Sequence, residues 1–388
     1  MTNDQLLQHF AAMYQASANG MASAPGRVNL IGEHTDYNQG FVLPCSLNFR
    51  TKVLFRARTD RQLVVHSLNY PGEHDSFALD KPVQTGPSQW GNYVRAMAFV
   101  LQRAGHPLPG ADLLIYSDVP QGAGLSSSAA LEVAVGGVFS QLANLQLSPE
   151  QIALFGQQAE NDFMDCQCGI MDQLISALGQ QGKALLIDTR SLNGTAVSIP
   201  DGLKILIINS NVQRGLVDSA YNERRQQCEQ AANKLGLAAL RDISYLELKQ
   251  QEYKLSALEA KRARHVVSEN DRTEQAAKAL QQGDMRLLSR LMAQSHQSMQ
   301  QDFEITVPAI DILVQLVSAV IGSEGGVRMT GGGFGGCVVA LLPDALVQDV
   351  KAVVQREYPK RTGLNADIFV CEASQGAQQL YSPASASV

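Results

Sequence analysis

The sequence lacks any run of about 18 apolar residues, which is the length that a membrane-spanning helix requires. Its N-terminus also lacks the basic segment followed by an apolar segment that is typical of a secretory signal peptide. The two absences predict a cytoplasmic protein that does not enter a membrane.

An excess of positive charge is missing as well. Thirty-one Lys and Arg residues face 37 Asp and Glu residues among the 388, so the formal net charge is -6. A nucleic-acid surface needs clustered Lys and Arg, and we therefore expect no nucleic-acid partner. A small anionic substrate held by a local site stays open. The composition, with 45% hydrophobic and 18% charged residues, is that of an ordinary globular protein.

The six cysteines are too scattered for a disulfide scaffold: Cys45, Cys166, Cys168, Cys228, Cys337 and Cys371. Cys166 and Cys168 form a C-x-C pair, but no second pair of Cys or His follows at the spacing of a zinc site. Reduced thiols are the favoured interpretation and metal binding is the minor one. A heptad pattern is missing too, so we expect a monomer.

Hydrophobic periodicity predicts strands and helices in both halves of the chain. Strands are expected at 41–58, 61–68, 111–120, 183–188, 203–209, and in "CVVALL" and "ADIFVCEA" near the C-terminus. Helices are expected at 5–14, 127–145, 148–161, near 170–179, and roughly at 217–236, 271–299 and 308–321. This mixture predicts α/β or α+β layers. The polar, turn-rich stretch 190–202 is the best candidate for a transition between domains.

The segment "GRVNLIGEHTDYNQG", residues 26–40, concentrates charge near the start of the chain. It contains Arg27, Glu33, His34 and Asp36. Charged groups are rarely buried unless they are paired, so this run is poor core material and suggests a site.

The segment "PQGAGLSSSAALEVA", residues 120–134, joins a predicted strand to a predicted helix. Its glycines allow backbone N–H groups to converge, and the helix N-terminus adds free N–H donors and a positive dipole end. These features favour phosphate binding, and residues 122–128 are called the phosphate loop below. The segment lacks the Lys of a Walker loop and matches the Rossmann fingerprint poorly. A serine-capped helix after a flexible turn is the alternative.

Two further stretches carry candidate site residues. Five of the six residues from 331 to 336 are glycine, which indicates either a flexible connection or close backbone approach beside the phosphate loop. In "AENDFMDCQCGIMDQLISALG", residues 159–179, Glu160 lies near the end of one predicted helix and Asp172 in the first turn of the next. The helix dipole favours an ionised Asp172, although acidic residues are also common in first turns as capping residues.

In their order and spacing these stretches resemble the GHMP small-molecule kinases, and residues 26–40 resemble the galactokinase signature within that family. The resemblance covers essentially the whole chain. It implies an α+β fold of two domains. Residues 1–200 would resemble the second domain of ribosomal protein S5, and residues 201–388 would be ferredoxin-like, with the active site between them. It also implies ATP-dependent phosphorylation of α-D-galactose at its 1-hydroxyl, the first step of the Leloir pathway of galactose catabolism.

The same resemblance implies a role for each site residue. The ATP phosphates would be held by Gly122, Ala123, Gly124, Leu125, Ser126, Ser127 and Ser128, and Mg²⁺ by Ser128 and Glu160. Asp172 would take the proton of the 1-hydroxyl or stabilise charge, with Arg27 beside it. The sugar would be held by Glu33, His34, Thr35, Asp36 and Tyr221. Trp90, the only tryptophan, would lie near the adenine or in the core.

Other functions remain open at this point. A kinase for a related sugar such as N-acetylgalactosamine would share Glu33, His34 and Asp36. A non-catalytic sensor of galactose and ATP could keep the fold while losing catalytic residues, but Arg27, Ser128, Glu160 and Asp172 are all present. A metal-dependent hydrolase using His34 and Asp36 is weaker, because further ligands at convincing spacing are missing.

Overall fold

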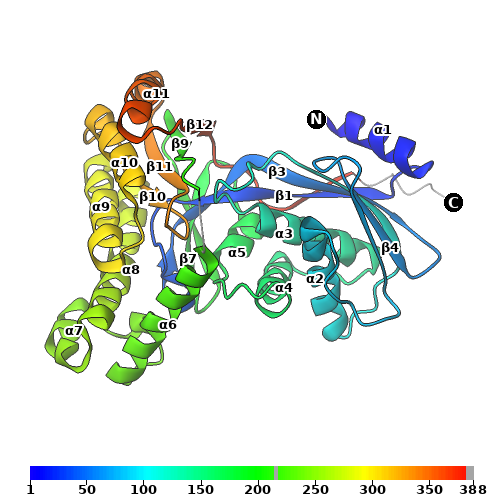
Figure 1. Ribbon diagram of the computed structural model, residues 1–388, viewed down its shortest axis with the longest axis horizontal. Coiled ribbons are helices and arrows are strands. Elements are labelled where there is room, and N and C mark those ends of the chain that lie inside the picture. Colours follow the sequence, from blue (N-terminus) through cyan, green and yellow to red (C-terminus); the bar gives the residue numbers. More distant parts are fainter. Residues whose placement is uncertain (214–216, 382–388) are drawn as a thin grey trace.

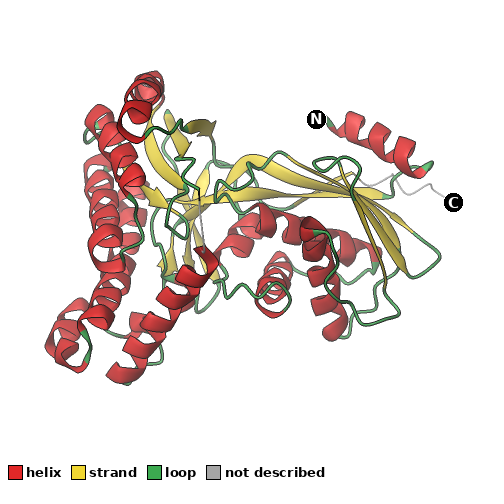
Figure 2. Ribbon diagram, in the orientation of Figure 1, coloured by secondary structure: helices red, strands yellow, loops and turns green. Residues whose placement is uncertain are grey.

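The computed structural model describes residues 1–213 and 217–381. A long sheet with helices beneath it occupies one end of the molecule, and a stack of helices against a smaller sheet occupies the other (Figure 1). Figure 2 shows that helices and strands are mixed in both parts. Among the described residues, no helix is both long enough and apolar enough to cross a membrane.

The first sheet has six strands in the order β13-β1-β3-β6-β4-β5. Its strands are β1 (Gly20–Asn29), β3 (Pro44–Ala57), β4 (Gln62–Ser67), β5 (His74–Ala78), β6 (Ala111–Ser117) and β13 (Gln378–Tyr381). One face is covered by α2 (Gln89–Arg103), α3 (Ser127–Leu142), α4 (Pro149–Asp162) and α5 (Met171–Leu178). The opposite face receives α1 (Asn3–Tyr14), whose Leu6 and Phe10 pack against Met21, Leu54 and Leu114.

The second sheet is antiparallel, with the order β10-β11-β9-β12. It contains β9 (Leu203–Asn209), β10 (Gly326–Thr330), β11 (Cys337–Pro343) and β12 (Asp367–Cys371). The part of the molecule built around this sheet is called the second half below, and the part around the six-stranded sheet is called the first half. The helices of the second half are α6 (Val217–Leu235), α7 (Tyr245–Gln251), α8 (Ala257–Gln282), α9 (Met285–Ser298), α10 (Pro308–Ile321) and α11 (Val347–Thr362). The α+β fold class predicted from the sequence is confirmed.

Strand β9 explains how the two halves are joined. Its side chains alternate between faces, as in any strand. Leu206 and Ile208 pack with the helices of the second half, whereas Ile205 and Ile207 share a core with Val28 of β1. The halves therefore share a hydrophobic core, which fixes the walls of any site between them.

A third, small sheet corrects the list of predicted strands. It consists of β2 (Phe41–Val42), β7 (Lys183–Asp188) and β8 (Asn193–Ser198). Strand β8 lies within 190–202, the expected transition between domains, where no strand was predicted, and it pairs antiparallel with β7. Strand β13 also returns from the far end of the chain to pair with β1. The division at residue 200 stays a prediction.

Helix α8 corrects a second prediction, because the single helical region expected at 271–299 is two helices. Helix α8 begins much earlier, after Ser256, which forms a capping box with Glu259. It ends before Gly283, which has a φ of 71° in the left-handed region, and Asp284 then caps α9. Short helical turns complete the fold: η1 (Asp36–Asn38), η2 (Leu240–Asp242), η3 (Glu252–Lys254), the π-helical η4 (Met299–Phe303) and η5 (Asp344–Leu346).

Candidate active site

A pocket of about 460 Å³ lies where the two halves meet. Almost all of the predicted site residues line it: Arg27, Glu33, His34, Asp36, Gly122, Gly124, Leu125, Ser126, Ser127, Ser128, Glu160, Asp172 and Tyr221. Gly331 and Gly332 of the glycine-rich stretch line it as well. The structure therefore brings together all of the stretches that stood out in the sequence.

Arg27 and Asp172 form a bidentate ion pair at the centre of the pocket. Arg27 projects from β1, and its Nε and Nη2 each lie 2.6 Å from an oxygen of Asp172 in the first turn of α5. Its Nη1 donates to the carbonyl of Gly124 at 2.7 Å. Burial alone would lower the pKa of Arg27, but the Asp172 carboxylate outweighs burial and raises it. The pair is consequently a rigid, charged centre between the phosphate loop and α5.

The loop 122–128 is anchored through its carbonyl groups. The carbonyls of Ala123 and Leu125 accept from the Cys337 thiol and the Arg27 backbone N–H, respectively. Every described peptide bond is trans, so the N–H that follows each carbonyl points the opposite way. Gly122, Gly124 and Ser126 all have positive φ angles, which turn the chain sharply here. Backbone donors of the loop are thus left available to a ligand.

Helix α3 begins at this loop without a side-chain cap. Ser126 occupies the cap position but makes no capping hydrogen bond, and its hydroxyl donates instead to Asp172. The serine-capped helix considered as the alternative is therefore not what forms. The first-turn N–H groups of α3 keep their capacity for an anion, and the helix dipole adds to it.

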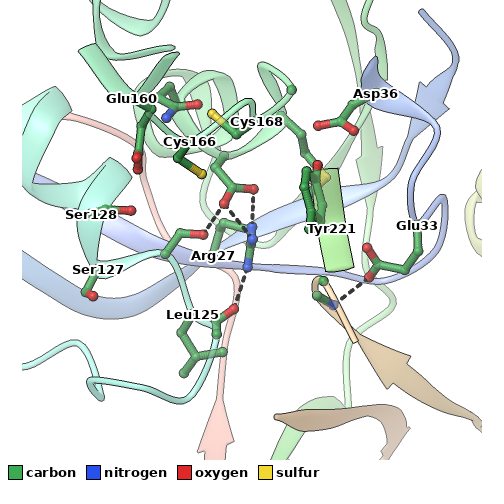
Figure 3. A pocket seen from close by; sticks show the side chains of 18 of the residues that line it. Arg27, Glu33, Asp36, Leu125, Ser127, Ser128, Glu160, Cys166, Cys168 and Tyr221 are labelled. Atoms are coloured by element: carbon green, nitrogen blue, oxygen red, sulfur yellow. Dashed lines mark hydrogen bonds and ion pairs between the residues drawn. The ribbon is translucent and has the colours of Figure 1, made fainter. Parts of the chain in front are cut away.

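Glu160 lies beside the phosphate loop, at the end of α4. Figure 3 shows Ser127, Ser128 and Glu160 on one side of Arg27, and Glu33, Asp36 and Tyr221 on the other. The buried Glu132 of α3 lies near Glu160, and burial followed by the neighbouring Glu160 raises the pKa of Glu132 well above its usual value. Such a carboxylate pair favours a bound cation or a shared proton.

A hydroxyl and a carboxylate at this position fit Mg²⁺. That ion takes few protein ligands, because it retains water and binds substrate phosphates. The described residues contain no cluster of three or more His, Cys, Asp or Glu side chains arranged for a metal ion.

Residues 32–41, called the sugar loop below, form the opposite wall. Glu33 is buried, and its Oε1 accepts hydrogen bonds from the Thr330 hydroxyl and the Gly331 N–H at 3.0 Å, and from Arg328 at 3.3 Å. All three donors belong to β10 and the glycine-rich stretch. The second oxygen of Glu33 is left for the pocket.

His34 has a positive φ of 61° and is held at Nδ1 by the Tyr37 hydroxyl, 2.7 Å away. Burial, and then the neighbouring His265, lowers the pKa of His34 to about 3, so its ring is neutral at pH 7. Its Nε2 is buried, and the backbone of Gly332 lies close enough to the ring to oppose part of this lowering of the pKa. The ring centroids of His34 and Tyr221 are 5.0 Å apart. Burial raises the pKa of the Tyr221 phenol well above its usual value.

Asp36 and Gly169 are in close contact. A Cβ at Gly169 would overlap the Asp36 carboxylate, so no larger residue fits at position 169 without displacing it. Burial, and then the charge of Asp172, raises the pKa of Asp36 to about 6. The sequence did not indicate a role for Gly169. The only signal was its position two residues before the helix that carries Asp172.

Two predicted residues do not line the pocket. Thr35 is buried, and its hydroxyl donates to the carbonyls of Gly32 and Phe41. The Thr35 hydroxyl therefore holds the sugar loop closed, and the expected contact of Thr35 with the substrate stays a prediction. Ala123 is also buried, with its side chain in the core shared by the two halves.

A second hollow opens beside the phosphate loop. Ser127 and Ser128 line both hollows. The rings of Tyr70 and Trp90 stack at its side, with their centroids 6.0 Å apart and 9° between their planes. Trp90 is largely buried and also lines this hollow. Its position is therefore compatible both with a core residue and with a residue near the adenine. A flat aromatic ring fits such a slot.

Comparison with known proteins identifies the family. Residues 8–57 match the galactokinase galactose-binding signature, residues 92–180 the GHMP kinases N terminal domain and residues 276–360 the GHMP kinases C terminal domain. A galactokinase from Lactococcus lactis, solved in complex with galactose, is 34% identical; the alignment covers 97% of this chain and 99% of that one, with a TM-score of 0.92. The chain belongs to the galactokinase family of GHMP kinases.

The family resemblance found in the sequence is thus confirmed. The chain is a sugar kinase of this family, an ATP-dependent phosphotransferase. More distant structures share the fold alone. The Methanococcus jannaschii mevalonate kinase is 17% identical with a TM-score of 0.65, covering 92% of this chain and 99% of that one. A Streptococcus pneumoniae phosphomevalonate kinase, in complex with phosphomevalonate and AMPPNP, is 12% identical with a TM-score of 0.61, covering 90% of this chain and 99% of that one.

Proposed function

We propose that the protein transfers the γ-phosphoryl group of ATP to the 1-hydroxyl of α-D-galactose, giving galactose 1-phosphate and ADP. The observation that carries the proposal is the Arg27–Asp172 pair, which lies between an uncapped helix N-terminus and a loop rich in acceptors. Phosphoryl transfer depends mainly on positioning and on neutralising charge, and this arrangement offers both.

The nucleotide would lie along α3. Its phosphates would bind the N–H groups of the loop 122–128 and the first turn of α3, and its adenine would enter the slot beside Tyr70 and Trp90. Ser128 and Glu160 would hold Mg²⁺, which supplies charge neutralisation on the phosphates when it is bound.

The sugar would lie against the sugar loop. Glu33 and Asp36 would accept hydrogen bonds from adjacent hydroxyls, and His34 Nε2 and the Tyr221 hydroxyl would complete the set. An epimer would leave one of these buried groups unpaired, and such a loss costs far more than a missing methylene. Specificity for the galactose configuration follows from this.

Asp172 would receive the hydrogen of the attacking 1-hydroxyl. Both of its oxygens already accept hydrogen bonds from Arg27, and one also accepts from Ser126, so the carboxylate is held in one orientation. Proton transfer to it would come late, because a sugar hydroxyl becomes acidic only as its oxygen bonds to phosphorus. Arg27 would then stabilise charge on the group in flight.

A phosphorylation assay tests the function. Purified protein with Mg-ATP is given galactose, N-acetylgalactosamine or glucose, and ADP and sugar 1-phosphate are measured, the latter by ³¹P NMR. We expect both products with galactose. Faster turnover with N-acetylgalactosamine would favour the related sugar kinase, and binding of galactose and ATP without products would favour a sensor. The retention of Arg27, Ser128, Glu160 and Asp172 argues against the sensor.

We also propose that the protein is a cytoplasmic monomer without a nucleic-acid or membrane partner, and that its domains divide near residue 200. None of the six cysteines forms a disulfide, which suits a reducing compartment. The net charge of -6 supports the expectation that nucleic acid is not a partner.

A further inference from the structure

The sugar loop belongs to the first half of the chain, but its backbone is held by a helix of the second half. Glu269 of α8 is fully buried. Its Oε1 accepts hydrogen bonds from the backbone N–H groups of Gly32 at 3.1 Å and Glu33 at 3.4 Å. The Ser295 hydroxyl of α9 donates to the same oxygen at 2.6 Å. One side chain of α8 thus binds the two peptide groups from which the sugar loop starts.

Two more residues of α8 bind the same loop. His265 Nε2 is 3.1 Å from the carbonyl of Glu33, and Asn270 Oδ1 accepts from the N–H of Phe41 at 2.9 Å. His265 and Glu269 are four positions apart and lie on one face of α8, and Asn270 is the next residue along the chain. Together the three side chains hold the sugar loop at both of its ends.

The contact between loop and helix is also sterically tight. A Cβ at Gly40 would overlap Asn270 Oδ1, and a Cβ at Gly32 would lie 3.0 Å from the Thr273 hydroxyl. Gly32 has a φ of 101°, which only glycine adopts readily. The loop therefore has little freedom to move relative to α8.

Glu269 and His265 each have a single protonation state at neutral pH. Burial alone would raise the pKa of Glu269, but the charges of Arg272 and Arg328 together with the Ser295 hydroxyl outweigh it and lower the pKa to about 2. Burial lowers the pKa of His265 to about 4, so its ring is neutral and its single N–H must lie on Nε2 to donate to Glu33. Arg272 pairs with the other oxygen of Glu269 at 2.7 Å.

We propose that Glu269 is a positioning residue for the sugar site: it fixes the backbone of Gly32 and Glu33, and so sets the affinity for the sugar without touching it. Glu269 does not line the pocket, whereas Glu33, His34 and Asp36 do. The Glu33 side chain is held separately by Arg328, Thr330 and Gly331, so the second half of the chain fixes this residue at its backbone and at its carboxylate. The inference rests on the proposed function, because it takes these loop residues as the sugar ligands.

A purely structural role makes a different prediction from a positioning role. If Glu269 only stabilised the fold, a substitution would lower Tm and leave both Michaelis constants of the folded fraction unchanged. If Glu269 positions the loop, KM for the sugar rises while KM for ATP does not, because the phosphate loop and α3 are supported elsewhere. The split between the two constants is therefore the decisive measurement.

The substitution Glu269→Gln tests the proposal. Glutamine keeps the size, but its amide cannot accept from the loop and from Arg272 at once. We expect KM for galactose and the calorimetric Kd for galactose to rise about tenfold or more, with KM for ATP within about twofold of wild type. Asp271→Asn is the matched control, since it removes one negative charge from the exposed side of the same helix and should change neither constant.

A second variant guards against misfolding. Asn270→Leu is similar in size and removes the acceptor for the Phe41 N–H, so it should produce the same split, whether or not Glu269→Gln folds. Folded variants whose KM for galactose is unchanged, or rises in step with KM for ATP, would overturn the positioning role alone. Wild-type protein that neither binds nor phosphorylates galactose would overturn the proposed function and this inference together.

Discussion

The carboxylate of Asp36 lies against the backbone of Gly169, with no room for a side chain between them. The two residues are far apart in the chain, one in the sugar loop and the other two residues before the start of α5. Their contact joins the proposed sugar ligands to the helix that carries Asp172. It makes the geometry of the sugar site depend on a glycine.

Gly169→Ala should therefore displace the Asp36 carboxylate. We expect KM for galactose to rise about tenfold or more, because a displacement on the order of 1 Å at a site is costly. Steady-state kinetics with varied galactose at saturating ATP measure this. Gly137→Ala in α3 is the control: its Cβ would meet Ala22 at 3.6 Å, an ordinary contact, and the change should add about 0.5–1 kcal/mol of helix stability without altering KM. Equal kinetics for the two variants would contradict the steric argument.

The pKa of Asp36 predicts an acidic limb in the activity profile. Burial and then Asp172 raise that pKa to about 6, so Asp36 loses its charge as the pH falls through 6. A protonated carboxyl accepts hydrogen bonds from sugar hydroxyls less well, and kcat/KM for galactose should fall below that pH. In Asp36→Asn the limb should disappear along with most of the sugar affinity. A limb that persists unchanged in this variant would assign it to another group.

The stability of the fold should change with pH in the opposite direction to the activity. The folded-state pKa of Asp36, about 6, lies above the value of 3.8 expected for an aspartate in the unfolded chain. The contribution of Asp36 to folding is therefore fully present below the lower value and is lost as the pH rises through about 6. At pH 7 the ionised group destabilises the fold, so Asp36→Asn should unfold at an equal or higher denaturant concentration than wild type. A clear loss of stability would show that the charge is better compensated than the contacts indicate.

Local signals in the sequence predicted many elements but not all of them. Ser148 and Pro149 predicted the start of α4, and Ser148 does form a capping box there. Strand β1 was missed because most of its residues are small or polar, although all ten are buried between neighbouring elements. The start of α8 was missed because that helix buries charged residues such as Arg262 and Glu269, which break the apolar pattern. Burial of this kind depends on partners distant in the chain.

The same limit applies to the site. The resemblance to a family identified the residues that line the pocket, since those motifs are continuous in sequence. It did not indicate that the side chains of Thr35 and Ala123 are buried, which leaves only their backbone groups for a ligand. It also could not identify Gly169 or Glu269, because each acts through a contact more than 100 residues away. Supporting residues are defined by tertiary contacts, and a motif does not contain that information.

Asp172→Asn should separate binding from catalysis. The amide keeps the size of the carboxylate but removes its charge and one acceptor, so the proton of the 1-hydroxyl has no recipient. We expect turnover to fall by about 10²–10⁴-fold, the range typical of positioned acid–base groups. Calorimetric binding of galactose should survive within about an order of magnitude, because Glu33, His34 and Asp36 remain. Near-normal turnover would remove Asp172 from the catalytic role.

Arg27→Lys tests whether geometry or charge is decisive at the centre of the site. Arg27 donates through Nε and Nη2 to Asp172 and through Nη1 to Gly124, so one planar group fixes both α5 and the phosphate loop. Lysine keeps the charge but cannot form this fork. We expect kcat to fall about 10²-fold, with KM for ATP raised because the loop carbonyl loses its donor. The double variant with Asp172→Asn should fall by much less than the product of the two single losses, since each change breaks the same pair. Multiplicative losses would mean that the two residues act independently, and the bidentate pair would then not be the unit that catalyses transfer.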